Sequence, residues 1–213
     1  MASAQHGIVF VVDDDPRVRE SIAMLLASFD IESMTFGSAT EYLAYRKPDG
    51  PSCLVLDVQL PDINGLDLQS RIAQDDHPHV VFITGHGDIP SSVRAIRTGA
   101  VDFLTKPFRE ADLMRAVRTA LDENRAARQK RDELADLRQR LAQLTRRERE
   151  VLPLVVSGFL NKQAALELGI SEVTLQIHRS SIMRKMHAAS LPDLVRMAAA
   201  LEVPLADGRP STR

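Results

Sequence analysis

The sequence of 213 residues contains one cysteine, Cys53. Because a single cysteine cannot form a disulfide within the chain, the fold does not depend on an oxidising compartment. No apolar run is long enough to cross a membrane, and the first residues lack the basic start and apolar core of a signal peptide. We therefore expect a cytoplasmic protein without a membrane partner.

The charge is distributed unevenly, although the formal net charge is only -2. Residues 1–122 hold 18 acidic and 11 basic side chains, whereas residues 141–200 hold 5 acidic and 8 basic ones. This asymmetry favours a cation site in the first part and a polyanionic partner for the second, although ordinary scatter of surface charge is the alternative. With a hydrophobic share of 44%, the chain is long enough for two domains with cores of their own.

Short apolar runs alternate with helix-like stretches in the first half. Ile8–Val12, Cys53–Leu56 and Val80–Ile83 are continuously apolar, which is typical of strands buried on both faces in a parallel sheet. Weaker strand signals lie at 31–36 and 103–104, and the helices expected between the strands are 16–29, a segment after Ser38 paired with Glu41, 65–74 and 89–98. The pattern predicts a doubly wound α/β domain with its site at the carboxyl ends of the strands.

A stretch without proline or glycine follows, from Arg109 to about Leu144. We predict one long helix there, which ends the first domain and continues as a linker. Four leucines near its end have the spacing of a short coiled-coil seam: Leu134, Leu137, Leu141 and Leu144. The seam predicts self-association through this helix, and packing against the chain's own domains is the alternative.

The residues from about 145 to 200 carry only helical signals. The expected boundaries are Thr145 with Glu148 (a capping box) and Gly158 for the first helix, Asn161 as cap and Gly169 for the second, Ser171 and about His187 for the third, and 191–201 for the fourth. The second and third helices together read as a helix-turn-helix, and the tail from Pro204 is expected to be disordered.

Polar side chains stand where the predicted strands end: Asp13, Asp14, Asp15, Asp57, Thr84 and Lys106. The carboxyl ends of parallel strands meet at one edge of a sheet, so these side chains should converge. Clustered carboxylates repel one another unless a cation lies among them, and their oxygens suit Mg²⁺. A carboxylate beside Mg²⁺ can attack phosphorus, while a lysine neutralises the phosphoryl oxygens. Asp15, which precedes Pro16, is expected to be a helix cap instead.

Residues 8–122 resemble a response-regulator receiver domain through "VVDDDPRVRESI", "LVLDVQLPDINGLDL", "VFITGHGD" and "GAVDFLTKPF". The resemblance implies a five-stranded parallel sheet with five helices in a domain of residues 1–122. It also implies that a sensor histidine kinase phosphorylates Asp57 and that Asp13, Asp14, Asp57 and the backbone carbonyl of Gln59 hold Mg²⁺. Lys106 would contact the phosphoryl group, and Thr84 and Phe103 would form the switch pair. Gln59 and His86 flank the expected pocket and are candidates for setting the lifetime of the phosphoryl group, in a direction that the sequence leaves open.

The segments "LTRREREVLPLVVSGFLNKQAALELGISEVTLQIHRSSIMRKM" and "SLPDLVRMA" resemble the LuxR-type helix-turn-helix of NarL/FixJ response regulators. The resemblance implies a linker over 123–143, an all-α DNA-binding domain over 144–203 and a tail over 204–213. It implies a homodimer that forms on phosphorylation, binds double-stranded DNA and regulates transcription, with RNA polymerase as a further partner. The expected base contacts are Glu172, Val173, Gln176, Arg179 and Ser180, and the expected phosphate contacts are Lys162, Thr174, Arg184 and Lys185.

Three positions depart from the family pattern. The family usually has isoleucine and alanine at Ala164–Ala165, lysine at Gln176 and asparagine at Ser181. These departures affect the preferred DNA sequence more than DNA binding itself. Two other functions stay open: a Mg²⁺-dependent phosphatase or phosphotransferase, and a helical half that docks a protein. We expect no enzyme, because the sequence offers no second substrate pocket and no separate acid–base pair.

Overall fold

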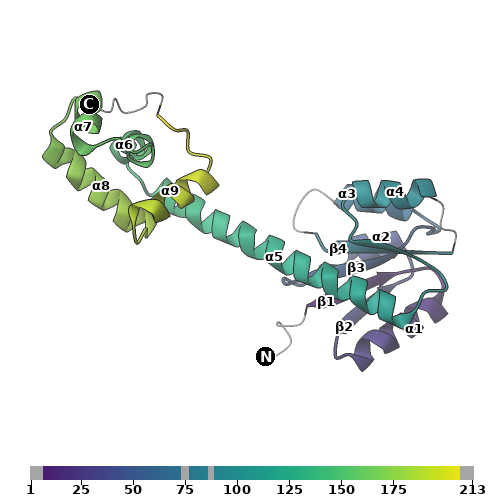
Figure 1. The fold of residues 1–213 in the computed structure, drawn as a ribbon. Helices are drawn as coiled ribbons and strands as arrows, with labels where there is room; N and C mark the ends of the chain where they lie inside the picture. The colour runs from purple at the N-terminus through teal and green to yellow at the C-terminus, as the bar shows by residue number, and fades with distance from the viewer. Residues whose placement is uncertain (1–6, 73–76, 86–88, 207–213) are drawn as a thin grey trace. The chain divides into compact units, whose positions relative to one another are not determined.

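The computed structural model describes residues 7–72, 77–85 and 89–206 (Figure 1). The chain divides into two compact units, and the boundary falls between Gln129 and Lys130. Among the helices of the described ranges, none is both long enough and apolar enough to span a lipid bilayer.

The first unit alternates strands and helices. Its elements are β1 (Ile8–Val12), α1 (Pro16–Ser28), β2 (Glu32–Phe36), α2 (Ala39–Ala44), β3 (Ser52–Asp57), α3 (Gly65–Ile72), β4 (His79–Thr84), α4 (Ile89–Arg97), β5 (Asp102–Thr105) and the first part of α5 (Glu110–Ala142). The five strands are parallel and lie in the order β2-β1-β3-β4-β5, which confirms the predicted sheet. The winding reverses between β1 and β3, and such a switch point leaves a crevice at the carboxyl ends of these two strands.

Both faces of the sheet are buried, as Figure 1 shows by the helices on its two sides. On one face Phe10, Leu54 and Phe82 pack in the core that includes residues of α2, α3 and α4. On the other face strand residues pack against α1 and α5, and Cys53 lies there without solvent exposure. This double burial explains the continuously apolar strands. Burial also raises the pKa of the Cys53 thiol.

As far as it is described, the second unit contains the end of α5 and four further helices. These are α6 (Arg146–Val156), α7 (Asn161–Leu168), α8 (Glu172–Met186) and α9 (Leu191–Ala200). They enclose one apolar core around Leu152, Leu175 and Ile182. Thr145 and Glu148 form the predicted capping box, and Ser171 caps α8 by accepting from the Thr174 N–H. Gly169 ends α7 in the left-handed conformation, with φ at 64°.

Three local predictions are wrong in detail. Asn161 does not cap α7 but is its first residue, because the Leu160 N–H donates to Gln163 Oε1 and the helix begins after Leu160. The Glu41 carboxylate accepts from the Gly37 N–H and not from Ser38, so only the Ser38 half of the predicted capping box forms. Of the tail predicted to be disordered, the residues up to Ala206 pack on the domain, since the Ala206 N–H donates to Ser157 Oγ and Ala206 packs on the core.

Parts of four predictions lie outside the described residues. The predicted end of the helix at 65–74 falls there, since α3 is described as far as Ile72. His86 and the tail from 207 onward also lie outside the described ranges. Of the side chains at the start of α4, none from 89–92 is described.

Candidate functional site

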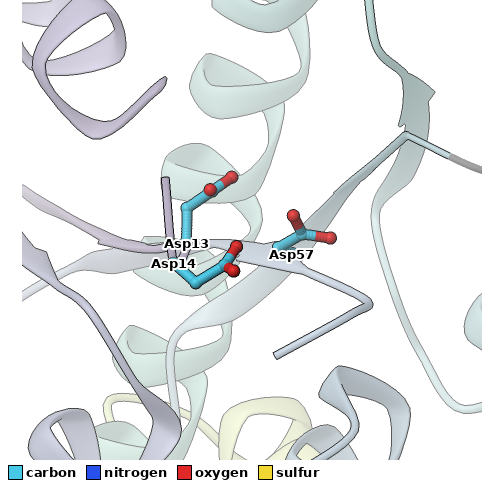
Figure 2. A group of neighbouring side chains, drawn as sticks. All are labelled: Asp13, Asp14 and Asp57. Carbon is cyan, nitrogen blue, oxygen red and sulfur yellow. The ribbon is translucent and has the colours of Figure 1, made fainter. Parts of the chain in front are cut away.

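Three carboxylates meet at the crevice predicted from the strand ends. Asp13 and Asp14 follow β1, and Asp57 is the last residue of β3. One carboxylate oxygen from each lies within 4.8 Å of the others (Figure 2). Asp13 is fully buried and Asp57 is 5% exposed, whereas Asp14 is open to solvent. Two carboxylates of the cluster are therefore buried, and the third, that of Asp14, can be reached from solvent.

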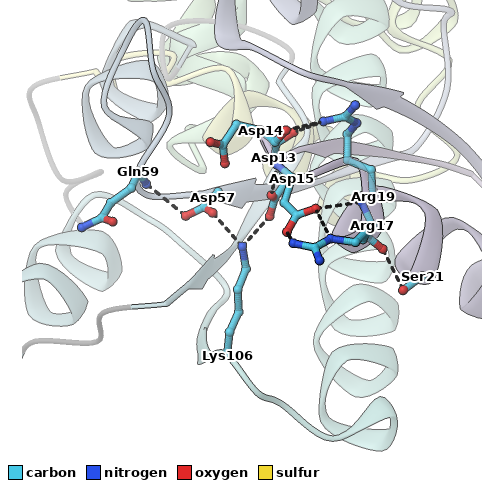
Figure 3. Close-up of polar contacts among 9 residues, drawn as sticks. All are labelled: Asp13, Asp14, Asp15, Arg17, Arg19, Ser21, Asp57, Gln59 and Lys106. Carbon is cyan, nitrogen blue, oxygen red and sulfur yellow. Dashed lines mark hydrogen bonds and ion pairs between the residues drawn. The ribbon is translucent and has the colours of Figure 1, made fainter.

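Lys106, which follows β5, joins the two buried carboxylates. Its Nζ atom lies 2.6 Å from Oδ2 of Asp13 and 2.7 Å from Oδ2 of Asp57 (Figure 3). Burial alone would lower the pKa of Lys106, but these hydrogen bonds outweigh burial and hold the pKa above its ordinary value. The lysine is therefore a fixed cation in the crevice.

The second oxygens of the same carboxylates are held by backbone amides. The Asp15 N–H donates to Oδ1 of Asp13, and the Gln59 N–H donates to Oδ1 of Asp57, both at 3.0 Å. Arg19 supports the β1 end by donating to the carbonyl oxygens of Asp13 and Asp14 (Figure 3). Backbone and side-chain donors thus hold both buried carboxylates in place.

Burial of Asp13 raises the pKa of its carboxyl group, and the hydrogen bond from Lys106 offsets only part of this effect. A second cation within reach would stabilise the ionised form further. The donor set consists of carboxylate oxygens with one exposed member, Asp14, which leaves room for water ligands. These features fit Mg²⁺, which prefers oxygen ligands and keeps several waters.

The other predicted residues of the crevice lie at neighbouring strand ends. Thr84 is the buried last residue of β4. Phe103 of β5 is half-buried, and its ring centroid lies 6.1 Å from that of Phe82. Asp15 caps α1 by accepting from the Arg17 N–H, and Pro16 follows it as the first helical residue, as predicted. Asp15 is therefore not part of the three-carboxylate cluster.

Two residues that shape the crevice were missed by the sequence analysis. A Cβ atom at Gly65 would lie 2.4 Å from the carbonyl oxygen of Asp57, so only glycine lets α3 begin this close to β3. Asp62 accepts hydrogen bonds from the Ala39 and Thr40 N–H groups and from the Thr40 hydroxyl. These bonds join the β3–α3 loop to α2, and they lower the pKa of Asp62 to about 2. The Asn64-Gly65 pair in the β3–α3 loop was the only feature of the sequence that could have pointed to Gly65. No feature of the sequence pointed to Ala39 and Thr40 as the partners of Asp62.

In the second unit, α7 and α8 form the predicted helix-turn-helix. Leu175, Ile182 and Met186 line the buried side of α8, as predicted. On its outer side Val173 is 72% exposed and Ile177 is 63% exposed. Ile177 was not predicted as a contact residue, although one helical turn separates it from Val173.

The predicted contact residues of α8 divide into two groups. Glu172, Val173, Gln176, Ser180 and Arg184 are exposed, as is Lys162 on α7, whereas Thr174 and Arg179 are half-buried. Gln176 and Arg179 both bind the side chain of Asn161, and the Thr174 hydroxyl binds that of Ser171. Arg179 therefore lies toward α7 and not on the outermost side of α8.

Lys185, which is predicted to contact a DNA phosphate, forms an ion pair within its own domain. Its Nζ atom lies 2.7 Å from Oε2 of Glu148, which is 4% exposed. Burial alone would raise the pKa of Glu148, but the hydrogen bond from Lys185 and those from neighbouring hydroxyl and amide groups lower it to about 2. We therefore assign Lys185 a structural role that joins α8 to α6.

The four leucines of the predicted coiled-coil seam also fall into two groups. Leu144 lies beyond the end of α5 and is 3% exposed in the core of the second unit, and Leu141 packs against the same core. For these two residues the alternative, packing against the chain's own domain, is confirmed. Leu134 and Leu137 are half-buried and stay predictions as self-association residues.

An acidic crevice of this kind and a helix-turn-helix unit together define a signalling protein that regulates transcription. The family model of the response regulator receiver domain matches residues 9–118, and that of the bacterial regulatory proteins of the luxR family matches residues 142–198. The chain belongs to the two-component response regulators with a LuxR-type DNA-binding domain. This family implies a sensor kinase and DNA as partners.

Relatives match the chain over almost its whole length. Nodulation protein W of Bradyrhizobium diazoefficiens is 48% identical over 202 residues, which cover 94% of this chain and 89% of the relative. The response regulator protein TmoT of Ectopseudomonas mendocina is 43% identical over 199 residues, covering 93% and 90%. The solved structure of the response regulator StyR aligns with a TM-score of 0.81 and 44% identity, covering 91% of this chain and 98% of StyR.

Proposed function

We propose that Asp57 accepts a phosphoryl group from a phosphohistidine of a sensor kinase and that this modification controls dimerisation and DNA binding. The observation that carries the proposal is the Lys106 bridge between Asp13 and Asp57. It holds a buried carboxylate beside a fixed cation at the carboxyl edge of the sheet. In the transfer, a carboxylate oxygen of Asp57 bonds to phosphorus while the phosphorus–nitrogen bond breaks and the imidazole leaves with a proton.

The residues proposed to hold Mg²⁺ are Asp13, Asp14, Asp57 and the backbone carbonyl of Gln59. When bound, the ion supplies positive charge to the phosphoryl oxygens. Lys106, which already donates to Asp13 and Asp57, would supply a second positive charge to the phosphoryl group. The Gln59 N–H fixes the orientation of the acceptor by holding Oδ1 of Asp57.

The signal is proposed to leave the crevice through Thr84 and Phe103. Phosphorylation adds acceptor oxygens at Asp57, and the Thr84 hydroxyl at the neighbouring strand end is the donor that would turn toward them. Phe103 is half-buried beside Phe82, and its ring would rotate inward when Thr84 moves. The surface of α4 and β5 would change as a result, and a second receiver would dock there.

The proposed DNA contacts lie on α7 and α8. A recognition helix places its first turns against base edges in the major groove, which suits Glu172, Val173 and Gln176 at the start of α8. Ser180 lies on the same exposed side of α8. Arg179, on the side of α8 that faces α7, is proposed as a further base contact. Lys162, Thr174 and Arg184 are proposed to bind phosphates, and Leu134 and Leu137 to support the dimer.

The experiment measures the molar mass and the DNA affinity of the full chain with and without acetyl phosphate and Mg²⁺. The DNA probe is selected from a random pool by the phosphorylated protein. We expect a phosphate-dependent dimer that binds this DNA more tightly, and Asp57→Asn should abolish both effects. Asp67→Asn, on the exposed side of α3, is the matched control and should respond normally. Equal binding and unchanged mass in the native chain and Asp57→Asn would contradict the proposal.

A further inference from the structure

The side chain of Asn161 joins the two helices of the helix-turn-helix. Its Nδ2 group donates to Oε1 of Gln176 at 2.7 Å, and its Oδ1 atom accepts from Nη1 of Arg179 at 3.0 Å. Gln176 and Arg179 are three residues apart on α8 and therefore neighbours on its surface. Because Asn161 begins α7, one amide group from that helix holds two proposed base contacts at once.

The chemistry of the three groups fixes which way each amide faces. A guanidinium group can only donate hydrogen bonds, so the oxygen of Asn161 must face Arg179. The amide nitrogen of Asn161 then faces Gln176 and can only donate. Gln176 must therefore turn its oxygen toward Asn161, which directs its own amide nitrogen away from α7.

This orientation determines what Gln176 presents to DNA. A glutamine with both ends free binds adenine in the major groove, with its oxygen accepting from N6 and its nitrogen donating to N7. Gln176 is exposed, but its oxygen is turned toward Asn161 and accepts from it, so the amide nitrogen is the end that faces away from α7. Its two remaining N–H groups match a base with adjacent acceptors. Guanine offers such a pair in O6 and N7.

We propose that Asn161 is a positioning residue that makes Gln176 prefer guanine over adenine in the recognised DNA. The inference rests on the proposed DNA-binding function and adds the base preference of one residue. Asn161 itself contacts no base in this arrangement and acts through Gln176. Gln176 stands where the family usually has lysine, which also presents only donors, so the amide network gives a glutamine the donor character of that lysine.

The test starts from DNA that the full, phosphorylated chain selects from a random pool. Gln176→Ala identifies the base pair that Gln176 reads, because preference at that pair alone is lost. We expect guanine there, and Asn161→Ala should lower the preference for guanine over adenine by about tenfold. In a Gln176→Ala background, Asn161→Ala should change this preference no further.

Two other variants separate positioning from folding and from general affinity. Asn161→Asp keeps the acceptor for Arg179 but lacks the donor for Gln176, so it should also lose the guanine preference. Circular dichroism tests whether each variant is folded. Lys162→Ala should weaken binding to all sequences alike. Adenine at the Gln176 pair, or full guanine preference in folded Asn161→Ala and Asn161→Asp, would overturn the inference alone. Absence of sequence-selective DNA binding by the native chain would overturn the proposed function and this inference with it.

Discussion

Lys185 in α8 donates to the buried carboxylate of Glu148 in α6 at 2.7 Å. Glu148 also completes the capping box with Thr145. The same carboxylate therefore accepts hydrogen bonds at the start of α6 and from the end of α8. Besides the apolar contacts of Leu175, Ile182 and Met186, one ionised side chain, that of Glu148, therefore holds α8 on its domain.

We expect Glu148→Gln to lower the free energy of unfolding of the second unit by about 2 kcal/mol, because it leaves the Lys185 ammonium group without its anion. Glu150→Gln is the matched control. Glu150 binds Arg146 and Arg147 at the surface, and such pairs contribute about 1 kcal/mol or less. Urea unfolding of the full chain followed by circular dichroism measures both values, and equal losses would contradict the role of Glu148.

The same carboxylate predicts a pH dependence. The pKa of Glu148 falls from 4.5 to about 2 on folding, so its contribution to stability is complete above 4.5 and disappears as the pH falls toward 2. The difference in unfolding free energy between the native chain and Glu148→Gln should therefore be constant from pH 7 to 5 and shrink between pH 4.5 and 3. A constant difference at pH 3 would show that the carboxylate is not held as described.

Lys106→Ala should bind Mg²⁺ about tenfold more tightly than the native chain, because it removes a positive charge from the carboxylates proposed to hold the ion. Phosphorylation by acetyl phosphate should nevertheless be lost, since the lysine is proposed to neutralise the incoming phosphoryl group. Calorimetric titration with Mg²⁺ and intact mass after phosphorylation give the two readouts. Lys47→Ala, near Tyr42, is the control lysine variant and should change neither. Weaker Mg²⁺ binding by Lys106→Ala would oppose this electrostatic account.

Gly65→Ala should displace the backbone at Asp57, because the added Cβ atom has only 2.4 Å to the Asp57 carbonyl oxygen. We expect a loss of about 2 kcal/mol in stability and slower phosphorylation. At Gly37 the nearest atom would lie 3.6 Å away, on the Arg19 side chain, so Gly37→Ala is the control. Thermal unfolding and the phosphorylation rate distinguish the two variants, and similar behaviour would argue against close packing at Gly65.

The sequence was sufficient for features that depend on short-range pattern. Apolar runs identified the buried strands, and the parallel sheet then brought Asp13, Asp57 and Lys106 to one edge. Caps such as Ser171 were found because the residue and its backbone partner lie within one turn.

Features that depend on a partner distant in the sequence could not be predicted. Lys185 resembled a basic surface residue at a helix end until Glu148 was placed beside it. Asn124 of α5 is buried and binds the Ser52 N–H and the His77 carbonyl oxygen, yet nothing near it in the sequence signals these contacts. Leu141 and Leu144 had coiled-coil spacing, but the nearest apolar surface was their own domain.

The one thiol of the chain has a practical consequence. Cys53 is fully buried in the sheet, and its raised pKa keeps it protonated, so alkylating reagents should reach it only when the receiver opens. Its labelling rate thus reports how often the first unit opens. The native sequence also serves as a silent background in which a cysteine introduced on α8 or α4 can carry a fluorophore or spin label, so that the two units can be followed during phosphorylation.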